Sequence, residues 1–178
     1  VVLAGGKSKR FGQDKSKVKL NNKTLLEHTL NKIKFKFNKI IIVSNNIKVK
    51  DYITINDCMD GQLGPLVGVL SAMKWIKKNN YPYNWIATFP CDTPFFNITL
   101  VDKFIEMSKL NNSLLYFAKS ENRRHNIFGL WSLKLIEILE NDILKNNHRK
   151  VENWANKVDV QIIKSSQGSD PASVAYKA

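Results

Sequence analysis

The chain has 178 residues, of which 43% are hydrophobic and 24% are charged, as expected for a globular domain with a substantial core. Its two separate cysteines exclude a disulfide scaffold, and no apolar stretch reaches the ~20 residues that cross a bilayer, so we expect a cytoplasmic protein that binds no membrane. The net charge of +13 favours anionic partners such as nucleotides or phosphorylated cofactors, although much of the lysine is expected on solvated faces.

Segments with strand and helix periodicity alternate along the first half of the chain. In chain order we expect a strand at Val1–Ala4, a helix from Thr24 to Phe37, strands at Lys39–Ser44 and Tyr52–Ile55, a helix at Leu66–Lys78 and a strand at Trp85–Phe89. Thr24 and Glu27 fit a capping box, in which each side chain accepts a hydrogen bond from a backbone N–H at the start of the helix.

The second half continues this alternation. It predicts a helix at Thr99–Leu110 opened by Thr99 and Asp102 as a cap pair, strands at Ser113–Ala118 and Ile127–Trp131, a helix at Leu133–Leu144 and a last strand at Val158–Ile163. Alternating strands and helices predict an α/β fold of three layers with a mostly parallel sheet. We expect residues 1–164 to form one domain and the small, polar residues 165–178 to form a weakly ordered tail.

The first predicted strand ends in a glycine-rich, basic loop, at the edge of the sheet where such folds bind ligands. Gly5, Gly6 and Gly12 lie among five basic residues, so backbone N–H groups can approach phosphate oxygens while lysine and arginine supply charge. The spacing matches neither a Walker A loop nor a dinucleotide-binding fingerprint. Lys15, late in this loop, would neutralise charge on a transferred phosphoryl group, and the alternative is a surface lysine.

Asp92 directly follows another predicted strand and stands between Pro90 and Pro94. The two prolines stiffen the loop, because each fixes its backbone φ angle. A carboxylate held rigidly at the ligand edge suits Mg²⁺, which takes oxygen ligands and retains waters and substrate phosphates. We favour this interpretation over a turn aspartate that bonds its own backbone.

Three other segments carry weaker signals. Asp57 precedes the glycine-rich stretch Gly61–Gly68, whose amides could face a base or a ribose, although the residues by themselves favour an ordinary turn before a helix. The basic clusters Arg123–His125 and Arg149–Lys150 are candidate anion contacts, and the alternative for both is a solvated face.

Five segments together carry a resemblance to a known family. They are Leu3–Lys15 (LAGGKSKRFGQDK), Gly64–Gly68 (GPLVG), Pro90–Phe95 (PCDTPF), His125–Trp131 (HNIFGLW) and Arg149–Val151 (RKV). In motif, order and spacing they resemble the molybdenum cofactor guanylyltransferase (MobA) family over about residues 1–155. Phe11 replaces the family's usual Met, Asn126 replaces its usual Pro, and the family's closing N-x-N-T-P-E-[ED]-L segment has no counterpart in residues 165–178.

The resemblance implies a Rossmann-like nucleotidyltransferase that transfers GMP from GTP to molybdopterin or its molybdenum-loaded form, with release of pyrophosphate and with Mg²⁺ as cofactor. It implies nucleotide contacts at Leu3, Ala4, Gly5, Gly6, Lys15, Asp57 and within Ser44–Asn46, a Mg²⁺ ligand at Asp92, and contacts to the pterin phosphate at Arg10, Arg149 and Lys150. Lys15, Asp92 and Arg10 would then be the catalytic residues. Molybdopterin-handling and molybdoenzyme-maturation proteins are the implied protein partners.

Two other functions stay open from the sequence. A molybdopterin cytidylyltransferase or a sugar-phosphate nucleotidyltransferase would share the fold, but these enzymes more often open with Ala-Ala-Gly and lack the Pro-Cys-Asp-Thr-Pro segment. A non-catalytic protein could use the positive charge to hold nucleic acid or an anionic cofactor. The chain lacks the aromatic and basic stacking motif of RNA-binding proteins, so we expect no nucleic-acid partner.

Overall fold

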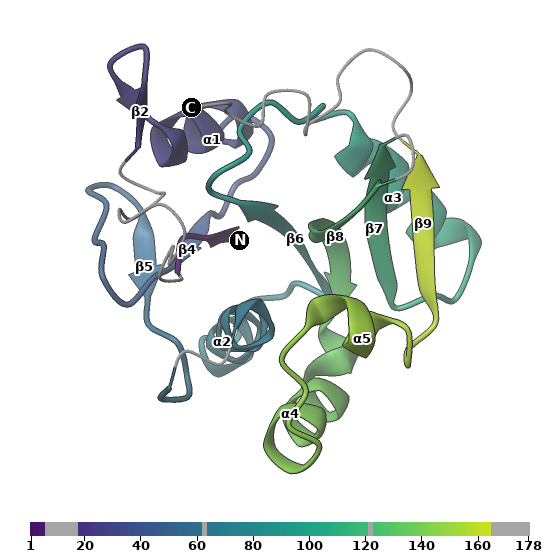
Figure 1. Ribbon diagram of the computed structural model, residues 1–178. Coiled ribbons are helices and arrows are strands. Elements are labelled where there is room, and N and C mark those ends of the chain that lie inside the picture. The colour runs from purple at the N-terminus through teal and green to yellow at the C-terminus, as the bar shows by residue number, and fades with distance from the viewer. Residues whose placement is uncertain (6–17, 62–63, 121–122, 165–178) are drawn as a thin grey trace.

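The structure, a computed structural model that describes residues 1–5, 18–61, 64–120 and 123–164, is built around a seven-stranded sheet with strand order β5-β4-β1-β6-β8-β7-β9 (Figure 1). The strands are β1 (Val2–Leu3), β4 (Ile41–Val43), β5 (Ile53–Ile55), β6 (Trp85–Pro90), β7 (Leu115–Ser120), β8 (Arg123–Ser132) and β9 (Val160–Lys164). The apolar runs that predicted these strands lie in the interior because helices cover both faces of the sheet.

Most neighbouring strands are parallel, as predicted. β1 is parallel to β4 and β6, and β4 is parallel to β5. β8 is antiparallel to both β6 and β7, whereas β9 is parallel to β7. Among the described strands of this sheet, β8 alone is therefore reversed, and it follows β7 directly in the chain because antiparallel neighbours need no crossover helix.

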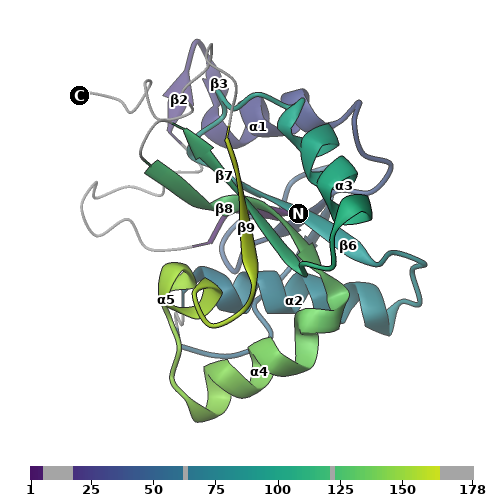
Figure 2. The ribbon, with the colours of Figure 1, turned by 90° about the vertical axis from the view of Figure 1, so that its right-hand side faces the viewer.

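The helices form the two outer layers (Figure 2). α1 (Leu25–Ile33) and α3 (Leu100–Leu110) cover one face of the sheet, while α2 (Pro65–Lys78), α4 (Ile136–Lys145) and α5 (Val151–Ala155) cover the other. A short 3-10 helix, η2 (Leu133–Leu135), leads into α4. The three-layer α/β architecture is confirmed. No helix within the described ranges combines the length and the apolar character needed to span a bilayer.

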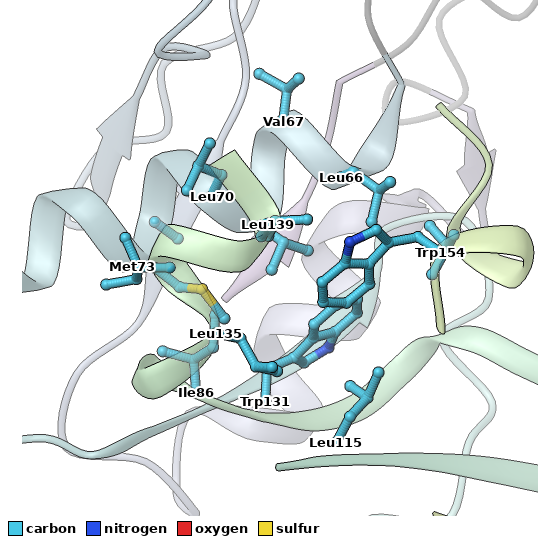
Figure 3. Close-up of a cluster of buried hydrophobic side chains, with 14 of the residues drawn as sticks. Leu66, Val67, Leu70, Met73, Ile86, Leu115, Trp131, Leu135, Leu139 and Trp154 are labelled. Atoms are coloured by element: carbon cyan, nitrogen blue, oxygen red, sulfur yellow. The ribbon is translucent and has the colours of Figure 1, made fainter. Parts of the chain in front are cut away.

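Two stacked tryptophans lie at the centre of the core beneath α2, α4 and α5 (Figure 3). The ring centroids of Trp131 and Trp154 are 5.8 Å apart and their planes differ by 16°. The indole N–H of Trp131 donates to Thr88 Oγ1 (2.8 Å), so its polar atom is satisfied inside the core. Leu66 and Leu70 of α2 are fully buried in the same cluster, and burial of each contributes roughly 1.5–3 kcal/mol.

Phenylalanines dominate the core on the other face. Phe89, Phe96, Phe104 and Phe128 contact one another in tilted and edge-on arrangements, with ring centroids 5.0–5.6 Å apart. Such geometries are favoured because the positive edge of one ring meets the negative face of the next. Phe89 lies before the Asp92 loop and Phe96 after it, so this cluster anchors both ends of that loop.

The predicted capping box of α1 is confirmed, but the helix is shorter than expected. Thr24 Oγ1 accepts from the N–H of Glu27 (3.1 Å), and Glu27 Oε2 accepts from the N–H of Thr24 (2.6 Å). The helix ends at Ile33, and Phe37 packs edge-on against Phe89 from the loop beyond it, at 5.6 Å. Helical spacing of apolar residues cannot distinguish a further helical turn from a loop residue that reaches the same core.

The predicted cap pair of α3 is wrong. Thr99 is the N-cap residue, but its side chain makes no capping hydrogen bond. Its N–H and its hydroxyl both donate to Asn97 Oδ1, at 3.0 and 2.8 Å. Asp102 instead forms an ion pair with Lys36. An asparagine two residues upstream competes successfully for the threonine hydroxyl, which is a local alternative to helix capping.

A small antiparallel hairpin of β2 (Lys19–Leu20) and β3 (Lys23–Thr24) precedes α1 and was not expected. Its turn is formed by Asn21 (φ 48°) and Asn22 (φ 63°), both in the left-handed region that asparagine tolerates. The two adjacent asparagines were the signal in the sequence that could have predicted this turn. Two-residue strands are too short for a hydrophobic period to reveal.

Asp142 ties the end of α4 to α5. Its largely buried carboxylate accepts hydrogen bonds from Trp154 Nε1 (3.0 Å), Lys157 Nζ (3.0 Å) and Asn146 Nδ2 (2.6 Å). Burial by itself would raise the pKa of this carboxyl, but the three hydrogen bonds and the charge of Lys157 outweigh burial and lower it. The carboxylate therefore fixes the position of the basic segment that joins the two helices.

We expect Asp142→Asn to lower the free energy of unfolding by about 1–3 kcal/mol near pH 7, because the amide leaves Lys157 without its ion pair and cannot accept all three hydrogen bonds. A lowered folded-state pKa adds stability that is complete above the unfolded-state value of about 3.9 and is lost as the pH falls through the folded-state value. The difference in free energy of unfolding between the protein and its Asp142→Asn variant should thus become smaller below about pH 4. Urea unfolding across the acid range measures this difference. Exposed Glu137→Gln on the same helix is the control, and a difference independent of pH would contradict the role of the carboxylate.

Candidate active site

Four parallel strands end side by side at one edge of the sheet. Beyond β1, the N–H of Ala4 donates to the carbonyl of Val43 (3.0 Å), and beyond β4 the N–H of Ser44 donates to the carbonyl of Ile55 (2.9 Å). The segments that follow β1, β4, β5 and β6 therefore start next to one another. This is the edge at which ligands of parallel α/β sheets bind, and the sequence places its unusual residues there.

The segment after β1 presents open backbone at this edge. Ala4 is buried and Gly5 is exposed. A Cβ at Gly5 would meet no atom nearer than the carbonyl oxygen of Val43 at 4.0 Å, so an approaching anion has room beside this glycine. Leu3, at the end of β1, is half-buried. The remaining predicted residues of this loop lie outside the described residues: Gly6, Arg10 and Lys15.

Asn45 and Asp57 link the segments that follow β4 and β5. Asn45 Nδ2 donates to Asp57 Oδ2 (2.9 Å), and the N–H of Asp57 donates back to Asn45 Oδ1 (2.8 Å). This reciprocal pair holds the carboxylate of Asp57 in one orientation. The sequence placed a nucleotide contact within Ser44–Asn46 without choosing a residue, and the geometry singles out Asn45 as the one whose side chain bonds to Asp57.

Asp57 is half-buried at this edge, and burial raises the pKa of its carboxyl. The hydrogen bond from Asn45 favours the charged form and opposes part of that rise. Asp57 therefore combines partial desolvation with a fixed orientation, which makes it a candidate functional residue at this edge.

The N-terminus of α2 approaches this edge very closely, which depends on two glycines. Gly64, the N-cap residue, has φ +86°, and a Cβ there would lie 3.0 Å from the carbonyl oxygen of Arg149. A Cβ at Gly68 would lie 3.1 Å from Leu3 Cδ2 and 3.7 Å from Asp57 Oδ1. The sequence by itself favoured an ordinary turn and helix start over a ligand loop, and the structure shows in addition that Gly68 lets the helix pack directly on β1 and beside Asp57.

Asp92 lies two residues beyond the end of β6. The preceding residue, Cys91, is buried and its N–H donates to the carbonyl of Leu3 (3.3 Å), which places Asp92 next to the segment after β1. Asp92 itself is half-buried. The predicted carboxylate thus lies at the ligand edge, next to the open backbone of Gly5.

The donor set around Asp92 fits a Mg²⁺ ion that is shared with a substrate. Mg²⁺ in phosphate-transfer sites binds one or two carboxylates, substrate phosphates and several waters. The described residues contain no group of three or more His, Cys, Asp or Glu side chains that could hold a metal. An ion at Asp92 could draw its further ligands from a bound triphosphate and from water.

The Arg149–Lys150 segment borders this edge, but its two side chains differ in availability. Arg149 Nη1 donates to the carbonyls of Ile143 (2.9 Å) and His148 (3.2 Å), so its guanidinium caps the end of α4. Lys150, the N-cap residue of α5, is exposed. Of the two predicted pterin-phosphate contacts in this segment, Lys150 is the one with its charge available to a ligand.

The Arg123–His125 cluster lies within β8 and is already engaged. Arg124 Nε donates to Asn126 Oδ1 (2.6 Å), and its Nη1 donates to Asn156 Oδ1 (3.0 Å). His125 Nε2 lies 2.6 Å from Ser120 Oγ. Through these contacts Arg124 and His125 join β8 to β7 and to the end of α5, a role in packing that neither a solvated face nor an anion contact describes.

The strand order and this edge define the class of fold, a Rossmann-like α/β fold that binds ligands beyond the carboxyl ends of its parallel strands, and solved structures share it. A molybdopterin-guanine dinucleotide biosynthesis protein A from Archaeoglobus fulgidus superposes with TM-score 0.74 at 20% identity, covering 92% of this chain and 81% of that chain. A 2-C-methyl-D-erythritol 4-phosphate cytidylyltransferase from Francisella tularensis superposes with TM-score 0.70 at 17% identity, covering 95% and 91%. At these identities the likeness establishes the fold.

Sequence comparison gives the family. The model of the MobA-like NTP transferase domain matches residues 1–160. A molybdenum cofactor guanylyltransferase from Haemophilus influenzae is 32% identical over 157 residues, covering 85% of this chain and 79% of that protein. One from Rhizobium rhizogenes is 31% identical over 156 residues, covering 86% and 72%. The chain belongs to the MobA-like NTP transferase family, which confirms the resemblance carried by its five motifs.

We expect Asn45→Ala to raise the pKa of Asp57 further, because burial would then act without the opposing hydrogen bond. A carbon-detected NMR titration of the Asp57 carboxyl measures this shift. Asn46→Ala is the matched control, because the hydrogen bond of Asn46 to Ser44 Oγ (3.3 Å) is made by its backbone N–H. An Asp57 pKa that stays constant or falls in Asn45→Ala would show that the pair does not hold the carboxylate in its charged form.

Proposed function

We propose that this chain transfers GMP from GTP to molybdopterin or its molybdenum-loaded form and releases pyrophosphate. Membership of the MobA-like family and the curated guanylyltransferase relatives support this reaction. The observation that carries the proposal is the arrangement of Asp57, held by Asn45, and Asp92 at one sheet edge, on either side of the open backbone after β1.

Asp57 is the proposed contact to guanine. Guanine presents a ring N–H and an exocyclic amine on the same edge, and a carboxylate can accept a hydrogen bond from each. Asn45 occupies Asp57 Oδ2, which fixes the direction in which the carboxylate faces. Cytosine lacks the ring N–H, so the same carboxylate would bind it with fewer hydrogen bonds.

The segment after β1 is the proposed binding site for the triphosphate. The backbone N–H groups of Leu3, Ala4, Gly5 and Gly6 would hold phosphate oxygens, in the manner of other glycine-rich anion sites. Lys15 and Arg10 would add full positive charge to the same loop. Mg²⁺, when bound at Asp92, would neutralise part of the triphosphate charge and help orient the phosphates.

The proposed chemistry is an attack by the terminal phosphate of the pterin on the α-phosphorus of GTP, with pyrophosphate leaving in line. The attacking phosphate is already anionic, so the reaction needs no protein nucleophile and no general base. The main obstacle is repulsion between two anions. Backbone N–H groups, Lys15 and Arg10 reduce that repulsion and hold the two substrates in position, and Lys150 and Arg149 border the side that the pterin phosphate would approach.

The remaining expectations concern the setting of this reaction. We expect one catalytic domain over residues 1–164, a cytoplasmic location, and transfer of the product to molybdopterin-handling or molybdoenzyme-maturation proteins. The curated guanylyltransferase relatives support a small-molecule acceptor rather than nucleic acid.

The direct test measures pyrophosphate release with Mg²⁺, molybdopterin and each nucleoside triphosphate in turn. We expect release with GTP, and only when the pterin is present, because the pterin phosphate is the nucleophile. Release with CTP in preference to GTP would retain the mechanism but overturn the assignment of guanine. No release with any triphosphate, despite measurable GTP binding, would overturn the enzymatic proposal.

We expect Asp92→Ala and Lys15→Ala each to lower turnover by ~10²-fold or more while the fold persists, because one electrostatic contact to a transferring phosphoryl group is worth that order. Steady-state pyrophosphate release and circular dichroism measure the two quantities. Exposed Asp51→Asn and Lys50→Ala, which precede β5 at the opposite edge, are the matched controls. Near-normal turnover in either variant would remove that residue from the mechanism.

A further inference from the structure

A cavity of about 880 Å³ opens at the sheet edge opposite the candidate active site. Its lining comes from the ends of α2 and α3, the segments that lead into β6 and β7, and the segment that follows β8. Figure 2 shows the end of α3 and the loop between α2 and β6 on the same side of the molecule. The proposed GMP transfer uses none of these segments, and the volume lies within the roughly 300–1,000 Å³ range of small-molecule sites.

Two lysines give this cavity a positive charge that the protein does not neutralise. Lys77 lies in the last turn of α2 and Lys134 lies in η2, and both are exposed. Among the described residues, neither has a carboxylate partner, and none of the side chains that line the cavity is Asp or Glu. Lys74, one turn before Lys77, does form an ion pair with Glu140, but Lys74 does not line the cavity.

Aromatic rings form one wall. Tyr81 stacks between Trp75 and Tyr83, with centroids 5.4 and 5.8 Å away and planes 22° and 9° apart. Lys39 Nζ lies 4.9 Å from the centroid of Tyr81 and adds positive charge behind this stack. Trp85, half-buried at the start of β6, also lines the cavity. Flat rings of this kind bind the face of a planar ligand.

Side-chain amides supply the remaining polar groups. Asn80, Asn84 and Asn112 line the cavity, and their side chains make no hydrogen bond to any described residue. Asn111 differs, because its Oδ1 accepts from the N–H of Ser113 (3.2 Å) and is therefore used by the fold. Three amides without protein partners can orient the hydroxyl or carbonyl groups of a ligand.

We propose that this cavity binds a phosphorylated small molecule that carries a flat ring, comparable in size to a nucleotide. Its phosphate would pair with Lys77 and Lys134, and its ring would contact Tyr83 and Trp85. The occupant is not the GTP of the active site, because α2 separates Gly64 at that site from Lys77 here by its 14 residues, about 20 Å of helix.

The test uses ¹⁵N-labelled protein and 1-naphthyl phosphate as the probe. The indole N–H resonance of Trp85, assigned with Trp85→Phe, reports on the cavity, while those of Trp131 and Trp154 report on the core. We expect a saturable shift of the Trp85 resonance with no comparable shift of the two core indoles. We expect 2-naphthol, which has the ring without the phosphate, and inorganic phosphate, which lacks the ring, each to bind at least tenfold more weakly.

The double variant Lys77→Ala/Lys134→Ala should weaken 1-naphthyl phosphate at least tenfold. Lys78→Ala/Lys109→Ala removes the same charge from exposed positions outside the lining and should leave the affinity within about twofold, because screened surface charges contribute little. Equal weakening by the two double variants, equal binding of 2-naphthol, or no saturable Trp85 shift at millimolar probe would each overturn the proposal. None of these outcomes bears on the guanylyltransferase proposal, which is tested by pyrophosphate release.

Discussion

The parallel register of β1 with β4 and β6 is the constraint on which the rest of the structure depends. Because the strands run the same way, their carboxyl ends meet, and residues that are far apart in the chain become neighbours. Gly68 then lets α2 pack against Leu3 at van der Waals distance, which brings the start of the helix beside Asp57. The parallel strands bring Asp57 and Asp92 to one edge with the backbone after β1, and the close approach at Gly68 adds the start of α2 to that edge.

The electrostatics of the active-site edge follow from that geometry. A protein with net charge +13 places two half-buried carboxylates where anionic substrates would bind. In the proposed reaction Asp57 would accept hydrogen bonds from the N–H donors of a base, and Asp92 would hold a cation jointly with phosphates. The basic residues proposed to offset the substrate charge lie in other segments than the two carboxylates. In the proposed site, different loops would therefore attract the anionic substrates and recognise the base.

Local rules predicted much of the fold and failed where tertiary contacts took over. The capping box at Thr24 was correct, because both partners lie within one turn. Phe37 was wrongly included in the first helix, since it packs on Phe89 from a loop and helical spacing cannot show this. The predicted cap of α3 failed for a local reason instead, because the Thr99 hydroxyl donates to Asn97, two residues upstream. The aromatic stack and the two lysines that line the cavity come from separate segments of the chain. Hydrophobic periodicity in the sequence does not show that these segments lie close together.

The sequence by itself determined the strand and helix alternation, the glycine-rich loop, the isolated Asp92 and the five motifs of the family, because these are properties of residue types and short spacings. Only the tertiary structure showed that Asn45 is the one of three adjacent polar residues whose side chain bonds to Asp57. It also showed that Lys150 is exposed, whereas the guanidinium of Arg149 caps α4. It also decided that Lys77 and Lys134 share one cavity. The physical reason is the same in each case: which donors and charges meet depends on how strands and helices are packed, and packing joins residues that are distant along the chain.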